Sequence, residues 1–511
     1  MYDVIVIGGG HNGLTAAAAL ARAGRKVIVL ERREILGGIA ADEEFAPGFR
    51  TAGLLHDTTG VRPEVVAALG LERYGLKRRE RPPSIFVPTR EGRGLLLHDD
   101  PYRAAGEIAA FSTADVAAYA SFRAFIDRVG VVLERFWNQP PPDLGDTRPG
   151  NLLSLLSKAW SVRRLGERDL TELLRIVPMP AADWLNERFE SQVLKTALAA
   201  PGLLGDFVGP RSPGTSAPLL LHECNAHGGT IGGPAKLVAA LLAACRDLHV
   251  EVRTSAEVRS ARIANGQALG VTLADGETVD AKLVLASCTP QQAFLRLVDQ
   301  RVLAQRLVER VQAIRARGTV AKLNLAIRGA FEFACRPGPV EFARIAPRLD
   351  DLERAFDAVK YRRFSEPPAL DIYVPTVSDP SLAPPGHSVV SVLVSYAPYD
   401  LAGGWTDAAR ERLARAAIAV IEQHAPGLSE RILARELLTP VDLELRYALT
   451  GGHVWHGERG LDQLLVRPVP ECARYATPIE GLYLCGSGSH PGGGITCAPG
   501  MLAASAILER S

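Results

Sequence analysis

Residues 2–38 read YDVIVIGGGHNGLTAAAALARAGRKVIVLERREILGG, and this stretch decides the fold. Apolar, β-branched residues open it, which is typical of a buried strand, and a glycine cluster that fits G-x-G-x-x-G follows. The predicted elements are, in order, a strand Asp3–Ile7, a turn Gly8–Gly13, a helix Leu14–Ala23 and a strand Lys26–Leu30. The stretch therefore predicts a βαβ unit whose second strand ends at an acid, Glu31.

Each part of this unit has a physical role in binding a dinucleotide. Gly8 allows the tight turn, Gly10 lets the backbone approach a diphosphate, and Gly13 lets the helix pack closely on the strand. The helix N-terminus offers free N–H groups and a partial positive charge to the phosphates. Glu31 can accept hydrogen bonds from a ribose diol, and its charge disfavours a 2′-phosphate. The unit therefore predicts a dinucleotide site that does not take NADP.

Length and composition exclude several classes of function. The chain has 511 residues, of which 47% are hydrophobic and 23% charged, as expected for a globular protein of two or three domains. The formal net charge is +1, so no strong field attracts nucleic acid. No apolar run is long enough to span a membrane. A strand begins within three residues of the N-terminus, leaving no room for a targeting peptide, so we expect a cytoplasmic location.

The cysteine pattern excludes two further kinds of site. Seven cysteines are widely spaced, and none form C-x-x-C. Neither the redox pair of a disulfide reductase nor a ribbon-type zinc site is therefore expected, and no metal ligands are predicted.

Further segments extend the dinucleotide hypothesis along the chain. Arg33 to Gly38 fits R-x-x-x-G-G, in which a guanidinium can neutralise a diphosphate and glycines let the backbone pass close. A hairpin predicted over 43–56 carries His56 back toward the cofactor. From Gly228 a glycine-rich turn, a helix and several strands follow, the last of them over 282–286. Near the C-terminus, a strand over 481–486, a glycine-rich crossing and a helix over 495–508 form another strand–loop–helix unit.

These segments resemble the phytoene-desaturase-related FAD oxidoreductases of the amine-oxidase-like superfamily, and most closely the pyridine nucleotide-disulfide oxidoreductase domain-containing branch. The resemblance covers nearly the whole chain, and LYLCGSGSHPGGGITCAPG at 482–500 is its most specific part. It implies one non-covalent FAD, a cap domain with an apolar tunnel, and helix N–H groups near Thr496 that stabilise reduced flavin. The residues expected to bind FAD are Gly8, Gly10, Asn12, Gly13, Glu31, Arg32, Arg33, Gly37, Gly38, Val258, Gly486, Ser487, Gly494, Ile495 and Thr496.

The resemblance also implies the fold class, which is α/β. A two-segment, Rossmann-type FAD-binding domain like that of glutathione reductase is expected to carry an inserted α+β substrate or cap domain. The FAD-binding domain is predicted over 1–75, 216–298 and 470–511, and the cap domain over 76–215 and 299–469.

The reaction implied is removal or addition of hydrogen across C–C bonds of an apolar, polyene- or isoprenoid-like substrate, with hydride transfer to flavin N5. A nearby base would take any proton, and histidine has a suitable pKa near neutrality. The candidate bases are His453, His456, His490 and His56. Each can equally be a structural histidine. No second G-x-G-x-x-G unit appears, so the electrons are expected to pass to oxygen, a quinone or a redox protein.

Three alternatives stay open: a flavin amine oxidase, a redox-neutral polyene isomerase, and a non-catalytic FAD-binding partner protein. Met501 departs from the family pattern, where an arginine or a small polar residue is expected, and puts one flavin or substrate contact in doubt. Cys497 can be a packing residue or a covalent tether. The basic, amphipathic stretch 152–176 is expected to be a cap-domain helix, with peripheral membrane contact as its alternative. Neither the substrate nor the oligomeric state follows from the sequence.

Overall fold

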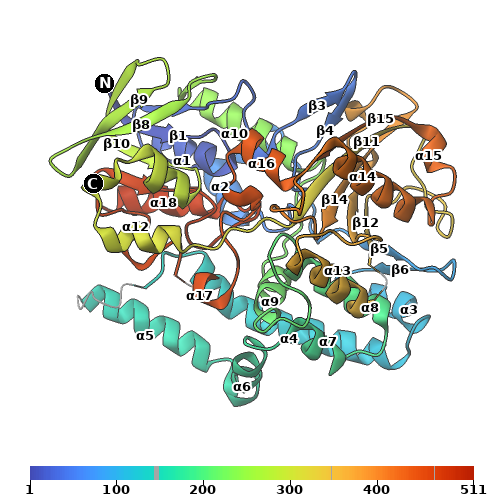
Figure 1. Ribbon diagram of the computed structural model, residues 1–511. Coiled ribbons are helices and arrows are strands. Elements are labelled where there is room, and N and C mark those ends of the chain that lie inside the picture. Colours follow the sequence, from blue (N-terminus) through green and yellow to red (C-terminus); the bar gives the residue numbers. More distant parts are fainter. Residues whose placement is uncertain (143–148, 347, 465, 511) are drawn as a thin grey trace.

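The computed structural model describes residues 1–142, 149–346, 348–464 and 466–510. Figure 1 shows a sheet and its covering helices at the upper left, a second sheet at the right, and a layer of helices along the bottom. Both termini belong to the first of these parts, where the first and last elements of the chain pack together (Figure 1).

The first sheet has the order β7-β2-β1-β10-β9-β8, with β16 paired to β10. Its strands are β1 (Tyr2–Ile7), β2 (Val27–Leu30), β7 (Glu251–Arg253), β8 (Val258–Ala264), β9 (Gln267–Leu273), β10 (Thr278–Ala286) and β16 (Leu482–Leu484). The pairs β1–β2, β1–β10, β2–β7 and β10–β16 are parallel. The predicted βαβ unit is thus present and lies in the middle of this sheet.

The alternation of side chains along β1 explains how the sheet is covered on both faces. Val4 and Val6 pack with the helices α1 (His11–Arg22), α10 (Pro234–Asp247) and α18 (Ala498–Leu508). Ile5 and Ile7 face the opposite way and pack with residues of the antiparallel β8–β9 hairpin. All four side chains are almost fully buried, which is why this strand reads as a continuous apolar run.

The second sheet has the order β15-β11-β14-β13-β12-β5-β6. Its strands are β5 (Ile85–Pro88), β6 (Gly94–Leu97), β11 (Val320–Arg328), β12 (Phe342–Ile345), β13 (Leu370–Tyr373), β14 (His387–Ser395) and β15 (Ile432–Leu438). The helix α14 (Asp407–Glu422) packs Leu413 and Ile421 against it. Every residue of β11 except the last is buried, although Lys322 and Asn324 interrupt its apolar pattern.

The helices along the bottom of Figure 1 form a third core with β5 and β6, the last two strands at one end of the second sheet. The stretch 152–176, expected to be one cap-domain helix, is divided into α5 and α6 at Gly166, whose φ is +78°, so that prediction is wrong as a single element. Residues 101–137 likewise form two helices, α3 and α4, with a break before Thr113. The helices of this layer are α3 (Pro101–Ala109), α4 (Ala114–Trp137), α5 (Pro149–Arg163), α6 (Gly166–Ile176), α7 (Ala181–Asn186), α8 (Gln192–Leu203), α9 (Ser216–Cys224) and α13 (Leu349–Lys360).

The remaining elements connect these layers, and the small antiparallel hairpin β3–β4 confirms the turn predicted over 43–56. They are α2 (Pro63–Leu69), β3 (Glu43–Ala46), β4 (Phe49–Thr51), α11 (Pro290–Gln292), α12 (Gln305–Gln312), α15 (Leu428–Arg431), α16 (Pro440–Tyr447) and α17 (Leu461–Leu464). The α/β fold class is therefore confirmed. The strands of the two sheets fall inside the two predicted sets of segments, while the domain boundaries themselves stay a prediction.

Candidate functional site

Three distant segments meet at the N-terminus of α1. The amide of Gly37 donates to the carbonyl of Gly9 over 2.8 Å, which joins the R-x-x-x-G-G segment to the glycine turn. Asn12 Nδ2 donates to Ser487 Oγ over 3.0 Å, and His11 Nε2 lies 3.2 Å from the carbonyl of Gly494. The predicted cofactor residues of the N- and C-terminal segments are thus brought to one place.

This helix terminus fits a diphosphate. Gly10 occupies the N-cap, no side chain caps the helix, and its first turn contains no acid. The first N–H groups of a helix have no acceptor within the helix and carry a partial positive charge. A Cβ added to Gly10 would meet no atom within 4 Å, so open space lies beside the backbone there. The turn therefore has the form expected of a dinucleotide cradle.

Glu31 occupies the position expected of a ribose ligand at the end of β2. Its carboxylate is buried and accepts the amide protons of Gly9 and Arg33, over 2.8 and 2.9 Å. The amide of Ala256 donates to the main-chain carbonyl of Glu31 over 2.8 Å, so the segment that leads into Val258 runs alongside. The two oxygens of Glu31 are held in place and keep further lone pairs for a diol.

The two arginines of this segment take different directions. Arg32 Nη2 donates to the carbonyls of Leu445 and Arg446 in α16, over 2.8 and 2.7 Å. Arg33 pairs with Glu43 over 2.7 Å and lies above the ring of Tyr447, while its Nη1 is buried without a partner among the described residues. Their predicted contacts with a cofactor stay predictions, and the free N–H group of Arg33 is the better placed to make one.

A cavity of about 230 Å³ lies between the C-terminal glycine-rich segment and the second sheet with its helices. Since a cavity of about 10–15 Å³ on the same measure already holds one water molecule, this one admits an organic ligand. Gly494, Ile495 and Thr496 line it on the cofactor side. Apolar side chains line most of the rest, among them Leu55, Ile85, Leu97, Tyr119, Trp137, Leu198, Leu393 and Trp455. Charged groups also reach it, so the lining is not uniformly apolar.

His56 is the candidate base that lines this cavity. Its Nε2 lies 2.9 Å from Asp371 Oδ1, and Arg344 Nε donates to the other carboxylate oxygen over 3.0 Å. Burial lowers the pKa of His56, although Asp371 opposes this shift. Burial by itself would raise the pKa of the Asp371 carboxyl, but Arg344 and His56 outweigh that effect and hold this pKa well below its usual range. The imidazole is therefore neutral and donates from Nε2. Its Nδ1 is buried, has no partner among the described residues, and keeps a free lone pair.

Lys322 lies close to this histidine and was not anticipated from the sequence. Its Nζ donates to the carbonyl of Leu54 over 2.7 Å, two residues before His56. The side chain is 1% exposed, and burial lowers its pKa to about 7. A lysine that titrates near neutrality can exchange a proton as well as carry a charge. The only signal in the sequence was a charged residue inside an apolar strand.

Two other candidate histidines lie elsewhere. His490 Nε2 donates to the carbonyls of Phe136 and Gln139, both at 3.1 Å, and burial lowers its pKa to about 4. It therefore holds the C-terminal loop against the end of α4. His456 is half-buried near His11, and desolvation lowers its pKa to about 3. Neither side chain lines the cavity, and a catalytic role for either stays a prediction.

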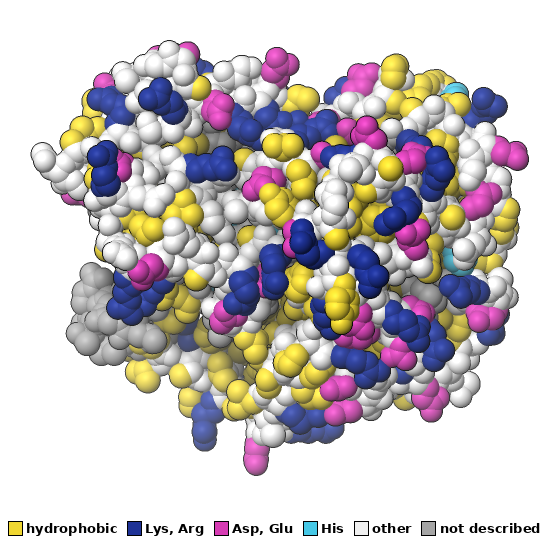
Figure 2. Space-filling model, viewed as in Figure 1, with side chains coloured by type: hydrophobic (Ala, Val, Ile, Leu, Met, Phe, Trp, Pro, Cys, Tyr) yellow, Lys and Arg dark blue, Asp and Glu magenta, His cyan; other side chains and the backbone are white. Residues whose placement is uncertain are grey.

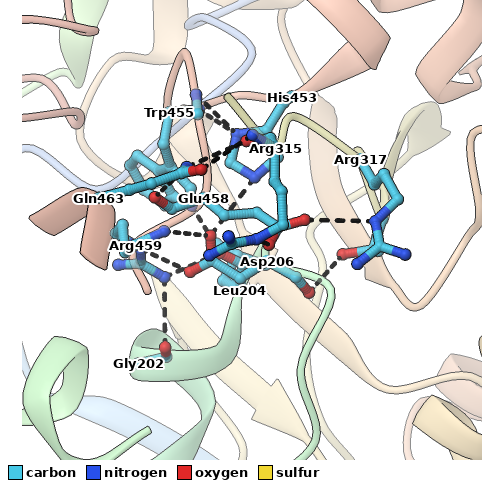
Figure 3. Close-up of polar contacts among 12 residues, drawn as sticks. Gly202, Leu204, Asp206, Arg315, Arg317, His453, Trp455, Glu458, Arg459 and Gln463 are labelled. Carbon is cyan, nitrogen blue, oxygen red and sulfur yellow. Dashed lines mark hydrogen bonds and ion pairs between the residues drawn. The ribbon is translucent and has the colours of Figure 1, made fainter. Parts of the chain in front are cut away.

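His453 lies inside a network that fixes the loop over residues 453–459 (Figure 3). Its Nδ1 accepts the amide protons of Trp455 and Gly457, both over 3.3 Å, so its proton is on Nε2, which lies 3.4 Å from Asp206 Oδ1. Arg459 also pairs with Asp206, over 2.7 Å. Burial of Asp206 is outweighed by these two partners, and its pKa is lowered. The network positions Trp455, which lines the cavity, rather than presenting His453 to a ligand.

The outer surface shows no field of one sign on the face drawn in Figure 2, where basic and acidic side chains alternate. Within the described residues no helix combines the length and apolarity that crossing a membrane requires.

Cys497 is fully buried at the start of α18, and burial raises the pKa of its thiol to about 12.

Comparison with protein families agrees with the geometry at both ends of the chain. Residues 6–62 match the NAD(P)-binding Rossmann-like domain. Residues 174–507 match the flavin-containing amine oxidoreductase family, which is more than half of the chain. The first match covers the glycine turn and Glu31, and the second covers Lys322, Asp371 and the C-terminal glycine-rich segment.

Curated relatives are similar over almost the full length. Mouse pyridine nucleotide-disulfide oxidoreductase domain-containing protein 2 is 35% identical, over 99% of this chain and 93% of its own. A limonene dehydrogenase subunit of Castellaniella defragrans is 27% identical, over 99% and 94%. A lycopene-forming phytoene desaturase of Pseudescherichia vulneris is 24% identical, over 98% and 97%.

A solved oxidoreductase from Methanosarcina mazei has the same fold, with a TM-score of 0.60 and 18% identity over 99% of this chain and 100% of that one. The resemblance read from the sequence is thereby confirmed, as is FAD as the cofactor. The chain belongs to the flavin-containing amine oxidoreductase family, within its phytoene-desaturase-related part, and is an FAD-dependent oxidoreductase.

Proposed function

We propose that this protein dehydrogenates, or in the reverse direction saturates, a C–C bond of a substrate with a polyene- or isoprenoid-like apolar body. The observation that carries the proposal is the cavity between the cofactor segment and the cap, which is largely apolar and is lined by His56, a neutral histidine whose buried Nδ1 has no partner among the described residues. The relatives named as a limonene dehydrogenase and a phytoene desaturase support an isoprenoid substrate class.

Bound FAD supplies a two-electron acceptor for this chemistry. The chain contributes a dry, apolar surface that holds the substrate body, and His56 Nδ1, which takes the proton that leaves the substrate. Asp371 orients the imidazole and stabilises the imidazolium that forms, because its carboxylate is 2.9 Å from Nε2. The predicted partners follow as proposals: an apolar small molecule and an external electron acceptor that is oxygen, a quinone or a redox protein.

Anaerobic flavin spectroscopy on the FAD-loaded protein tests this function. We expect a polyene or monoterpene to bleach the visible flavin absorbance and to yield a product lighter by two hydrogens. An amine that bleaches the flavin, with peroxide released in air, would instead establish the amine oxidase alternative. A product of unchanged mass formed only with pre-reduced flavin would establish an isomerase. No bleaching by any of these classes would favour the non-catalytic partner protein.

We also propose that α5 contacts a membrane surface, from which an apolar substrate would enter. Leu153, Leu156 and Trp160 are 67%, 66% and 60% exposed, and their spacing places them on one side of the helix. Arg163 and Arg164 follow in the next turn, also exposed, and can approach anionic headgroups. Figure 1 shows α5 at the lower left edge of the molecule.

Vesicle co-sedimentation tests this contact. The triple variant L153S/L156S/W160S is expected to lower binding to anionic phosphatidylserine vesicles at least tenfold, because each large apolar side chain contributes roughly 1.5–3 kcal/mol on burial. L445S is the control, since Leu445 is 70% exposed on α16, apart from this helix. Equal binding of the triple variant and the native protein would contradict the proposal. A shift in oligomeric state in the triple variant would instead assign the apolar residues to contacts between copies.

A further inference from the structure

Arg62 is a buried cation without an anionic partner. It immediately precedes α2, its side chain lines the cavity, and it is 3% exposed. Its Nη1 lies 3.2 Å from His227 Nε2, and no carboxylate oxygen of the described residues lies within ion-pair distance of its guanidinium. Glu64 and Glu134 act on it only from farther away. Burying a charge costs free energy unless a partner compensates it.

One edge of this guanidinium is free. Nε is buried and has no hydrogen-bond partner among the described residues, and Nη2 forms none with them either. These two nitrogens share the edge opposite the Nη1 that His227 occupies. Two parallel N–H groups on one edge match the two oxygens of a carboxylate. Because an arginine cannot accept a hydrogen bond, His227 Nε2 is the acceptor, and that imidazole is neutral.

Most of the other arginines that line the cavity are compensated by a carboxylate. Four of them lie within 3.0 Å of a carboxylate oxygen, as the pairs Arg79–Glu341, Arg123–Glu223, Arg344–Asp371 and Arg459–Asp206. Arg467 donates instead to the carbonyls of Gly488, Trp455 and Gly457. Four described arginines of the cavity thus pair with a carboxylate, and Arg467 uses its Nε and Nη2 on carbonyls, whereas Nε and Nη2 of Arg62 have no partner among the described residues.

We propose that the free edge of Arg62 binds a carboxylate group of the substrate, so that the substrate is an apolar molecule with an acidic end. The inference rests on the proposed function and deepens it. The amide of Arg62 donates to the carbonyl of Thr496 over 3.2 Å, so the anion site lies beside the cofactor segment. Trp137, Pro491 and Thr496 line the cavity as well and provide apolar contact for the adjoining chain.

The charge of the site favours a monoanion. Arg62 and His227 together present a single positive charge, because burial and the neighbouring Arg62 lower the pKa of His227 and keep it neutral. A carboxylate balances one positive charge, whereas a phosphate ester would leave excess negative charge in a buried place. The site therefore selects a carboxylic acid over a phosphorylated isoprenoid.

Titration of the FAD-loaded protein with dodecanoate and with dodecanol, followed through the flavin spectrum, tests the inference. The native protein is expected to bind dodecanoate at least tenfold more tightly than dodecanol, because a charge-assisted pair is worth on the order of a 10- to 100-fold difference in affinity. In R62M the two probes should bind equally. R62K, which keeps the charge but cannot form a bidentate pair with a carboxylate, should retain part of the preference for dodecanoate.

The double variant R123M/E223Q is the matched control, since it removes a neutralised pair of the same cavity without leaving an unpaired charge, and the preference should change by less than about twofold. An unchanged preference in R62M, or none in the native protein, would overturn the proposal. Loss of FAD from R62M with the preference intact would assign the guanidinium to the cofactor instead. If R62M does not fold, the native comparison and R62K decide.

The result of the dodecanoate titration can be separated from the result of the test of the proposed function. In one outcome the native protein prefers dodecanoate, but no isoprenoid acid, saturated or unsaturated, bleaches its flavin. The anion site is then supported and the dehydrogenase function is not. Bleaching by neutral isoprenoids, without any preference for dodecanoate, gives the reverse result.

Discussion

The variant G13A is expected to purify without FAD and with a lowered stability. Gly13 lies in the first turn of α1, where an added Cβ would stand 2.1 Å from the carbonyl oxygen of Gly8. That oxygen belongs to the backbone of the turn and cannot move aside alone, so α1 must shift away from β1. Overpacking of this kind costs about 3 kcal/mol of stability. A shift of the helix terminus that binds the diphosphate is expected to weaken FAD binding by roughly 100-fold, which is about 2.8 kcal/mol. Flavin content and thermal unfolding measure the two effects.

The matched variant G10A separates the cofactor from the fold. A Cβ at Gly10 would meet no protein atom within 4 Å, and its φ of −74° suits any residue. We therefore expect an unchanged unfolding temperature without FAD, together with at least tenfold weaker FAD binding, because the methyl group would occupy the space that the diphosphate needs. If G13A bound FAD as the native protein does, close packing of α1 would not be what shapes this site.

Features encoded within a short stretch of sequence were predictable. The βαβ unit follows from residues 2–30, because the strand, the glycine turn and the helix are each determined by neighbours in the chain. The helix boundaries in the layer that contains α3 to α9 were not predictable. The apolar spacing continues through Ser112 and through Gly166. Periodicity therefore indicates one long amphipathic helix at each of these places, although the backbone turns there. A positive φ at Gly166 leaves no trace in such a pattern.

The candidate site was predictable only on its cofactor side. His56 was identified because it lies in a segment that returns toward the glycine turn, but nothing in its surroundings distinguished it from the other histidines. Its partner Asp371 is 315 residues away, and Lys322 reaches the carbonyl of Leu54 across 268 residues. Such pairs form only when the second sheet packs on the cofactor segment. A single sequence contains no information on that register, so acid–base assignment required the structure.

Replacing His56 is expected to slow flavin reduction strongly without changing how much FAD the protein binds. In H56Q the rate constant of flavin reduction should fall by about 10²- to 10⁴-fold with FAD content unchanged, which is the usual contribution of a general base. Stopped-flow absorbance under anaerobic conditions measures it. H424Q is the control, because His424 is also buried but packs beside the outer helix α14, away from the cavity. Equal losses in both variants would show that burial, and not proton transfer, explains the effect.

The pH profile gives the sharper test, since two neighbours act on His56 in opposite directions. Burial lowers the pKa of His56, so its neutral form persists below pH 6.5 and the rate should fall only in more acidic solution, tenfold per pH unit. Asp371 raises this pKa and Lys322 lowers it. In D371N the acidic fall should therefore move to lower pH, and in K322M to higher pH. If both variants leave the profile in place, His56 is not the group whose protonation stops the reaction.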